Sequence, residues 1–192
     1  MADPHLVNLL RRRLLGAPAR CGRTAILAID GRSGAGKSTL AGQILARLPP
    51  QAALISLEEL YPGWHGLAAA ADLLRRWVLR PLAAGRPARY YHFDWTAGRF
   101  ADEPVIIGRP RWLVVEGVGA LDPRVAAFVS VGVWLQAPTS LRYLRAMNRD
   151  GDLYRPWWDV WAAQERRYLG AGRAKGARFL TARTQASSPT DR

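Results

Sequence analysis

One octapeptide constrains the fold of this chain more than any other feature: residues 31–38 read Gly-Arg-Ser-Gly-Ala-Gly-Lys-Ser. They satisfy every specified position of the phosphate-binding pattern G-x-x-x-x-G-K-[ST], the P-loop. Glycines in this loop allow backbone N–H groups to turn inward around a phosphate, and the helix that follows adds the positive end of its dipole. The octapeptide therefore predicts a nucleoside-triphosphate site between a strand and a helix.

The residues on either side of the P-loop have the pattern that such a site requires. Residues 24–29 form an apolar run of strand length, as expected of a buried parallel strand. Residues 38–48 then place Leu40, Ile44, Leu45 and Leu48 on one helical face before two prolines end the helix. Between these elements, Lys37 is expected to reach the β- and γ-phosphates and the Ser38 hydroxyl to bind Mg²⁺. The predicted nucleotide-contacting residues are Gly31, Arg32, Ser33, Gly34, Ala35, Gly36, Lys37, Ser38 and Thr39.

Length and composition indicate a single domain. A chain of 192 residues with 49% hydrophobic content can bury one core. We expect one domain over residues 1–184, with a helix over 3–15 packed on it, and a disordered tail over 185–192, where Ala, Ser, Pro and Thr prevail. The sequence has no apolar run of membrane-spanning length and no apolar signal core, so we expect a soluble, cytoplasmic protein without a membrane partner. Cys21 is the only cysteine, which excludes an intramolecular disulfide and a cysteine-based metal cluster.

The formal net charge of +13 is carried almost entirely by arginine, since Lys37 and Lys175 are the only lysines. Along the sequence the arginines are scattered, and no recognisable nucleic-acid-binding motif accompanies them. A positive field attracts anionic nucleotides, but the sequence does not favour a nucleic-acid partner. The oligomeric state stays open, a homo-oligomer included.

Strand and helix patterns alternate along the chain. Strands are expected at 24–29, 52–56, 112–116, 129–135 and, more weakly, 179–181, and helices at 38–48, 67–78, 139–149 and 156–169, with a turn over 81–87. This alternation predicts an α/β fold, a central parallel sheet flanked by helices in three layers with the P-loop at its centre. Glu58 and Glu59 follow the second strand and Glu116 ends the third. Ligand sites in open parallel sheets lie beyond the carboxyl ends of the strands, so these acids should face the same crevice as the P-loop.

In these features the chain resembles the P-loop kinases of the uridine kinase and phosphoribulokinase group. The likeness spans about residues 24 to 170 and rests on four segments: the P-loop with its preceding Asp30, the Ser56-Leu-Glu-Glu-Leu-Tyr61 segment, the Val114-Val-Glu-Gly117 segment, and the arginine-bearing stretch after the fourth strand. The resemblance implies transfer of the γ-phosphate of Mg-ATP to a hydroxyl of a small molecule. It also implies a short, arginine-bearing lid over the phosphates.

The resemblance assigns roles residue by residue. Glu58 takes the position of the family's catalytic Asp, and Glu116 that of a Glu that assists Mg²⁺ or substrate. Glu58 is one methylene longer than Asp and Leu60 replaces an aromatic residue, so Glu59 remains a rival for the same role. Asp30 could either contact a water molecule bound to Mg²⁺ or fix the backbone of the loop through hydrogen bonds. The predicted catalytic residues are Lys37, Glu58, Arg145 and Arg149, with Arg142 a further lid candidate, and the predicted Mg²⁺ ligands are Ser38 and Glu116.

The acceptor is the least defined part of the prediction. The family's pyrimidine-reading segment is only loosely echoed by Tyr90, Tyr91, His92 and Arg99, which leaves uridine in doubt and a nucleoside as one option among small hydroxyl compounds. Candidate residues of an acceptor pocket are Tyr61, His92, Asp94, Trp95 and Arg99, while Trp157, Trp158 and Trp161 have a spacing typical of core packing.

Two other functions use the same loop. A P-loop ATPase or GTPase would need no small-molecule acceptor, but the chain lacks an N-K-x-D segment for guanine, and Gly117 rather than a second acid follows Glu116. A nucleotide- or nucleic-acid-binding protein without turnover is the second alternative, suggested by the charge alone.

Overall fold

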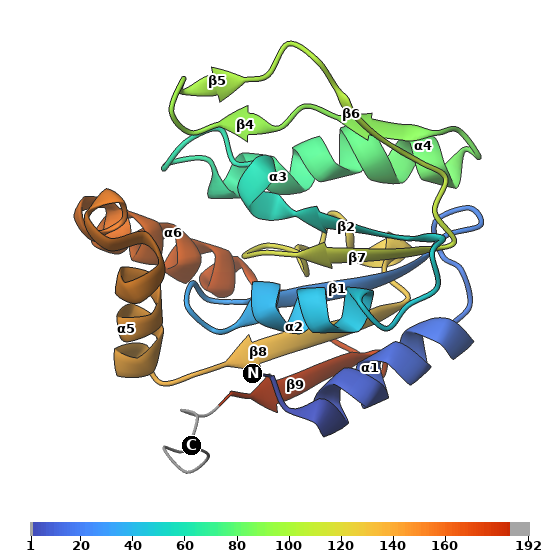
Figure 1. The fold of residues 1–192 in the computed structure, drawn as a ribbon, viewed down its shortest axis with the longest axis horizontal. Coiled ribbons are helices and arrows are strands. Elements are labelled where there is room, and N and C mark those ends of the chain that lie inside the picture. Colours follow the sequence, from blue (N-terminus) through green and yellow to red (C-terminus); the bar gives the residue numbers. More distant parts are fainter. Residues whose placement is uncertain (1, 185–192) are drawn as a thin grey trace.

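The structure, a computed structural model, describes residues 2–184. The predicted disordered tail over 185–192 lies outside the described residues. The fold is built on a five-stranded sheet with the order β2-β7-β1-β8-β9, in which all neighbours are parallel (Figure 1). The strands are β1 (Ala25–Gly31), β2 (Ala52–Ser56), β7 (Trp112–Glu116), β8 (Val131–Gln136) and β9 (Phe179–Arg183). Strands lie where the sequence predicts them, and β1, which leads into the P-loop, is central.

Helices cover both faces of the sheet. Helices α1 (Pro4–Gly16) and α2 (Lys37–Leu45) pack on one face, where their apolar side chains meet those of Leu27 and Ile29. Helix α3 (Leu67–Leu74), the π-helical turn η2 (Arg75–Leu79), α4 (Arg80–Ala83) and α6 (Trp158–Ala171) contribute to the core on the other face. The result is the predicted three-layer α/β arrangement.

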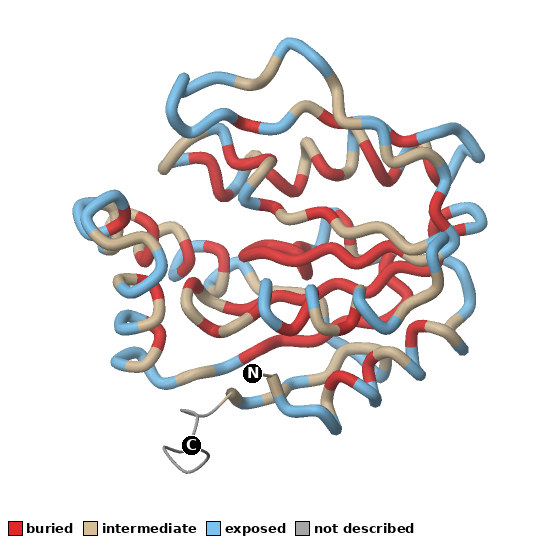
Figure 2. Tube along the Cα trace, in the orientation of Figure 1, coloured by how far each residue is buried: buried red, intermediate tan, exposed pale blue. Residues whose placement is uncertain are grey.

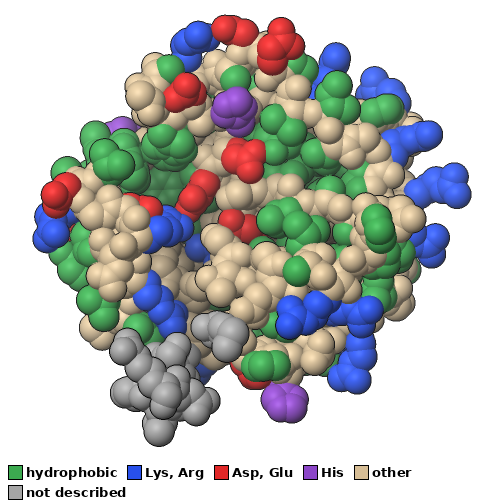
Figure 3. Space-filling model, viewed as in Figure 1, with side chains coloured by type: hydrophobic (Ala, Val, Ile, Leu, Met, Phe, Trp, Pro, Cys, Tyr) green, Lys and Arg blue, Asp and Glu red, His purple; other side chains and the backbone are tan. Residues whose placement is uncertain are grey.

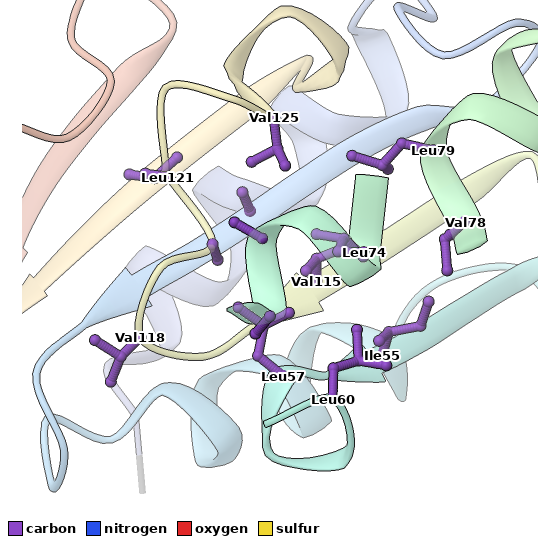
Figure 4. Close-up of a cluster of buried hydrophobic side chains, with 14 of the residues drawn as sticks. Ile55, Leu57, Leu60, Leu74, Val78, Leu79, Val115, Val118, Leu121 and Val125 are labelled. Carbon is purple, nitrogen blue, oxygen red and sulfur yellow. The ribbon is translucent and has the colours of Figure 1, made fainter. Parts of the chain in front are cut away.

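Strand β1 is buried along its whole length because both of its faces are covered (Figure 2). Its residues alternate between the two cores, with Leu27 on the α1–α2 side and Ile26 on the opposite side. The core on that opposite side packs residues from β2, α3 and β7 together, among them Ile55, Leu74 and Val115 (Figure 4). This packing fixes the ends of β1, β2 and β7 relative to one another.

The region between β2 and β7 differs from the sequence-based expectation in two ways. The helix predicted over residues 67–78 does not end before Pro81 but continues through it to Ala83. A proline normally interrupts the hydrogen bonds of an α-helix, and the π-helical turn just before Pro81 changes that hydrogen-bonding pattern. The following segment forms two small antiparallel ribbons that the sequence analysis did not predict. These pair β3 (Ala88–Tyr90) with β6 (Val105–Gly108), and β4 (Phe93–Asp94) with β5 (Arg99–Phe100).

The segment after β8 is helical, as predicted. Helix α5 (Thr139–Asp150) leads through two short 3-10 turns, η4 (Gly151–Leu153) and η5 (Arg155–Trp157), into α6. We call residues 139–157 the lid. Within residues 2–184, no helix is both long enough and apolar enough to cross a bilayer.

Two glycines allow a direct test of how tightly the strand ends are packed. Gly117 follows β7 at φ 143°, and a Cβ on it would lie 2.5 Å from the Leu57 Cβ, whereas a Cβ on Gly42 in α2 would meet nothing within 4 Å. We expect Gly117→Ala to lower the free energy of unfolding by about 3 kcal/mol through strain and overpacking. Gly42→Ala should raise it by up to about 1 kcal/mol, because alanine is the better helix former.

Urea unfolding monitored by tryptophan fluorescence measures both values. A Gly117→Ala protein as stable as the wild type would show that the turn after β7 is looser than the structure has it.

Candidate active site

The P-loop has the backbone shape of a phosphate cradle. Gly34 and Gly36 adopt φ values of 77° and 94°, and Gly36 caps the start of α2, whose first turn contains Lys37, Ser38 and Thr39. The unpaired N–H groups of this first turn therefore face the loop. Gly34 is also required sterically, since a Cβ there would lie 2.2 Å from the carbonyl oxygen of Arg142 in α5. The lid thus rests directly against the loop.

Asp30, just before the loop, is completely buried and acts as an acceptor for the surrounding backbone. Its Oδ1 accepts the N–H groups of Gly31 (2.6 Å) and Gly119 (3.1 Å). Its Oδ2 accepts the Leu121 N–H (2.8 Å) and the Tyr168 hydroxyl (2.6 Å). Burial raises the pKa of Asp30, and these hydrogen bonds oppose that shift. Of the two roles considered for Asp30, this geometry corresponds to the second, in which the carboxylate fixes the backbone of the loop.

Glu165 in α6 is a contact to the P-loop that the sequence analysis missed. Its side chain is 1% exposed; Oε1 accepts the Ser33 N–H at 2.6 Å and Oε2 accepts Arg32 Nε at 2.6 Å. Arg142 of α5 donates to the Ser33 carbonyl oxygen at 3.1 Å. A signal was present in the sequence, because Glu165 lies between Trp161 and Tyr168 on one face of α6, and a carboxylate on an otherwise buried face needs a partner.

Glu116, at the end of β7, lies beside the hydroxyl of the P-loop serine. Its Oε1 accepts the Ser38 hydroxyl at 3.1 Å and the Ser56 hydroxyl at 2.7 Å. The strand register pairs Glu116 with Ile29 on one side and Ser56 on the other, which explains the convergence. Hydroxyl and carboxylate oxygens are the hard ligands that Mg²⁺ prefers, so Ser38 and Glu116 fit this ion. Sequence analysis did not assign a role to Ser56.

The described residues contain no group of three or more His, Cys, Asp or Glu side chains that could hold a metal ion by themselves. A cation at Ser38 and Glu116 would therefore need further ligands from water or a bound phosphate. The Lys37 side chain is largely buried, and its Nζ donates to the Arg32 carbonyl oxygen at 3.3 Å. Its ammonium group is thus held over the loop.

Glu58 and Glu59, which the sequence could not tell apart, have different surroundings. Glu58 is 52% exposed, and its Oε1 lies 3.2 Å from a guanidinium nitrogen of Arg149 in the lid. The indole Nε1 of Trp95 donates to the Glu58 carbonyl oxygen at 3.1 Å. The Glu59 carboxylate instead accepts a hydrogen bond from the hydroxyl of Tyr90. Burial raises the pKa of Tyr90, and this bond to Glu59 raises it further. Glu58 therefore faces the lid, whereas Glu59 supports the neighbouring ribbon.

The arginines of α5 lie in three different places. Arg142 is buried on the side of α5 that faces the P-loop, where it donates to the Ser33 carbonyl and to the Thr139 hydroxyl. Arg145 donates to the Thr184 hydroxyl at 3.2 Å and approaches Gly36 of the P-loop. Arg149 reaches across to Glu58, and a second contact at 2.7 Å joins it to Asp150. Arg145 thus lies on the P-loop side of the lid and Arg149 on the Glu58 side.

The predicted acceptor-pocket residues lie in two places: Tyr61 is in the core, and the other four lie on or beside the β4–β5 ribbon, where Asp94 pairs with Arg99. Tyr61 is buried and donates its hydroxyl to the Val118 carbonyl at 2.9 Å. Asp94 accepts the N–H groups of residues 96 and 97 in its own turn, and Arg99 pairs with Asp102 on the surface. His92 is exposed at the bend between β3 and β4. Trp95 is the member of this set that the structure brings to Glu58.

An aromatic cluster joins Trp95 to the lid. Trp64 stacks between Tyr154 (5.4 Å between ring centroids) and Trp157 (5.5 Å), and Trp95 packs against it at 4.8 Å. Trp161, buried as predicted for a core residue, closes the cluster from α6. The cluster forms a wall beside Glu58 that links the loop before α3, the β4–β5 ribbon and the lid.

On the other side of the P-loop the structure has a cavity of about 760 Å³. It lies between the ends of β8 and β9 and the start of α5. Its lining includes Arg32, Gln136, Pro138, Thr139, Arg183 and Thr184. This volume is in the range of small-molecule and cofactor sites, and Arg32 connects the cavity to the phosphate loop. The P-loop is therefore flanked by this cavity on one side and by Glu58 on the other.

Comparison with known proteins supports the fold assignment. No family model matches the chain, and the search of curated proteins finds no match either. Among solved structures, one described as a possible uridine kinase from Bacillus stearothermophilus is 18% identical, with a TM-score of 0.58 over 86% of this chain and 97% of that one. A protein described as a fructose transport system kinase from Silicibacter sp. TM1040 is 20% identical, with a TM-score of 0.57 over 91% and 98%.

A third similar structure is YFH7 from Saccharomyces cerevisiae, described as a P-loop-containing kinase with a circular permutation. It is 8% identical, with a TM-score of 0.61 over 96% of this chain and all of that one. At these identities the likeness concerns the fold. The chain has the three-layer α/β fold of the P-loop kinases, and the fold resemblance expected from its sequence is confirmed.

The contact between α6 and the P-loop can be tested through stability. Glu165→Ala removes the acceptor of the Ser33 N–H and leaves Arg32 without its partner, so we expect a loss of roughly 3 kcal/mol in the free energy of unfolding. Glu165→Gln keeps an oxygen for Ser33 and should lose only about 1–2 kcal/mol.

Glu103 lies exposed in the loop between β5 and β6, and Glu103→Ala is the matched control, with an expected change within about 0.5 kcal/mol. Chemical denaturation of the three variants gives these values. Equal stability of Glu165→Ala and Glu103→Ala would contradict the buried contact.

Proposed function

We propose that this protein is an ATP-dependent phosphotransferase that moves the γ-phosphate of Mg-ATP to a hydroxyl of a small molecule. The observation that carries the proposal is the separation of two carboxylates at adjacent strand ends. Glu116 is engaged with the P-loop serine at 3.1 Å, while Glu58 is half-exposed and faces the lid. A hydrolase needs the first carboxylate, whereas a kinase also needs a second one to orient an acceptor hydroxyl.

The donor half of the proposed site is the P-loop with the cavity beside it. Residues Gly31 to Thr39 would hold the triphosphate, with Lys37 on the β- and γ-phosphates. The cavity next to Arg32 is large enough for the base and ribose of the nucleotide, and Arg145 projects toward the same side of the loop. Ser38 and Glu116 would hold Mg²⁺, which offsets charge on the phosphate oxygens.

The acceptor half is the space around Glu58. In the proposed reaction the acceptor hydroxyl gives its proton to Glu58, its oxygen forms a bond to the γ-phosphorus, and the bond from that phosphorus to the β–γ bridging oxygen breaks, so that ADP leaves. Arg149 pairs with Glu58, and a bound γ-phosphate would compete for its guanidinium group. This exchange would free the Glu58 carboxylate when the donor is in place.

The surroundings of Glu58 suit more than one class of acceptor. A nucleoside is one option, and Trp95 beside Glu58 offers an aromatic face to a base or a sugar. The similar structures are described as kinases of different kinds, one as a possible uridine kinase and one as a fructose transport system kinase, so both nucleosides and sugars belong in the test.

The experiment that tests the proposal measures ADP formed from Mg-ATP with nucleosides, nucleoside monophosphates, pantothenate and small sugars, each against a control without acceptor. We expect ADP formation that depends on one of these acceptors. ADP formed equally without acceptor would favour the alternative, a P-loop ATPase. Absence of ADP with every acceptor would contradict the proposal for these substrate classes.

The two glutamates provide a sharper test of the mechanism. Glu58→Gln should lower kcat by about 100-fold or more, because the general base is lost. Glu59→Gln should change kcat by less than about 10-fold, since Glu59 bonds Tyr90 rather than facing the lid. Lys37→Ala should abolish turnover while the fold is retained. Steady-state kinetics with the acceptor identified in the ADP assay measures kcat of each variant, and circular dichroism checks that each is folded. Equal losses of kcat in the two glutamate variants would show that Glu58 is not the general base.

A further inference from the structure

Arginines that are far apart in the sequence lie together at one end of the sheet, opposite the candidate active site. The loops that precede β1, β2 and β7 and the loop after α4 meet there. Three contacts join these loops: Gly22 lies against Leu82, the Arg109 guanidinium donates to the Gly85 carbonyl at 3.2 Å, and the Arg111 N–H donates to the Gln51 carbonyl at 3.1 Å. The exposed arginines of these loops are Arg20, Arg23, Arg47, Arg86, Arg109 and Arg111, here called the arginine pole.

The arginine pole contains no compensating acids. Segments 11–29, 46–55, 80–91 and 104–115 hold neither Asp nor Glu. Every ion pair found among residues 2–184 involves residues outside the pole. Helix α1 adds Arg12 and Arg13, both exposed, at the side of the pole where Arg11 bonds the Arg47 carbonyl.

The charge separation is visible on the surface. Figure 3 shows Lys and Arg side chains along the right-hand edge, where Figure 1 places the beginnings of β1, β2 and β7. The Asp and Glu side chains seen in the same view lie away from that edge. The arginine pole is therefore a positively charged surface at the end of the sheet opposite the P-loop.

Unpaired positive charges at one pole repel one another and weaken the compact state, unless a polyanion neutralises them. We propose that the arginine pole binds the phosphate backbone of nucleic acid without reading its sequence. Guanidinium groups form paired hydrogen bonds with phosphate oxygens, and such contacts supply affinity without base recognition. This inference does not depend on the proposed kinase function, because the pole is remote from the P-loop.

The composition of the pole favours nucleic acid over a membrane surface. Peripheral membrane binding usually combines basic residues with exposed apolar side chains that enter the lipid. The large exposed apolar residues among those described are Leu9, Trp95, Ile106, Tyr143, Leu144 and Leu153. None of them belongs to loops 16–24, 46–51, 84–87 or 108–111.

The test compares two variants of equal net charge. Arg20, Arg23 and Arg86 of the pole are replaced by Gln in one variant, and Arg155, Arg166 and Arg167, exposed arginines of the lid and α6, in the other. Binding of a fluorescein-labelled 25-base-pair DNA duplex of random sequence, and of its RNA counterpart, is followed by anisotropy across a range of salt concentrations. Vesicles with phosphatidylserine form a parallel arm.

We expect the pole variant to bind duplex at least about tenfold more weakly than the wild type, with the slope of log K against log salt reduced by about 3. The lid and α6 variant should bind like the wild type, and the pole variant should keep its Mg-ATP turnover and its stability. Equal losses in both variants would reduce the effect to bulk charge and overturn the proposal. So would absent binding by the wild type, or vesicle binding that depends on the pole while duplex binding does not.

Discussion

The candidate site depends on the buried carboxylate of Asp30. It joins the first residue of the P-loop, the loop after β7 and helix α6, through hydrogen bonds from Gly31, Gly119, Leu121 and Tyr168. A buried carboxylate is costly unless its oxygens are satisfied, and these donors come from parts of the chain distant in sequence. The same group therefore stabilises the loop and fixes the strand ends on which Glu116 and its neighbours stand.

The other carboxylates of the site differ in how deeply they are buried and in which residues they contact. Glu165 is buried and holds the P-loop against α6, and Glu116 stands beside Ser38 at the strand end. Glu58, which is half-exposed, faces Arg149. Because each carboxylate has a different partner, a single crevice can bind a phosphate chain on one side and leave a carboxylate available on the other. This asymmetry is the basis of the proposed phosphoryl transfer to an acceptor.

The distribution of charge adds a second asymmetry. Glu58, Glu59 and Glu116 lie where the strands end, and the arginine pole forms where they begin. The segments that form the pole are separated in the sequence, so the scattering of arginines along the chain gave no sign of a common surface. Burial of the strands in between leaves the loops at each end as separate surfaces, so the proposed nucleotide site and the proposed nucleic-acid surface lie apart.

The sequence by itself determined the five strands of the parallel sheet and their order along the chain, the place of the P-loop and the strand-end positions of Glu58 and Glu116. These follow from local pattern and from the geometry of parallel sheets. It could not separate Glu58 from Glu59, since neighbours in a turn have the same local pattern and differ only in partners, Arg149 and Tyr90, that lie far along the chain. Glu165 and the arginine pole were likewise decided by tertiary structure. Their contacts and their proximity depend on how the sheet brings remote segments together.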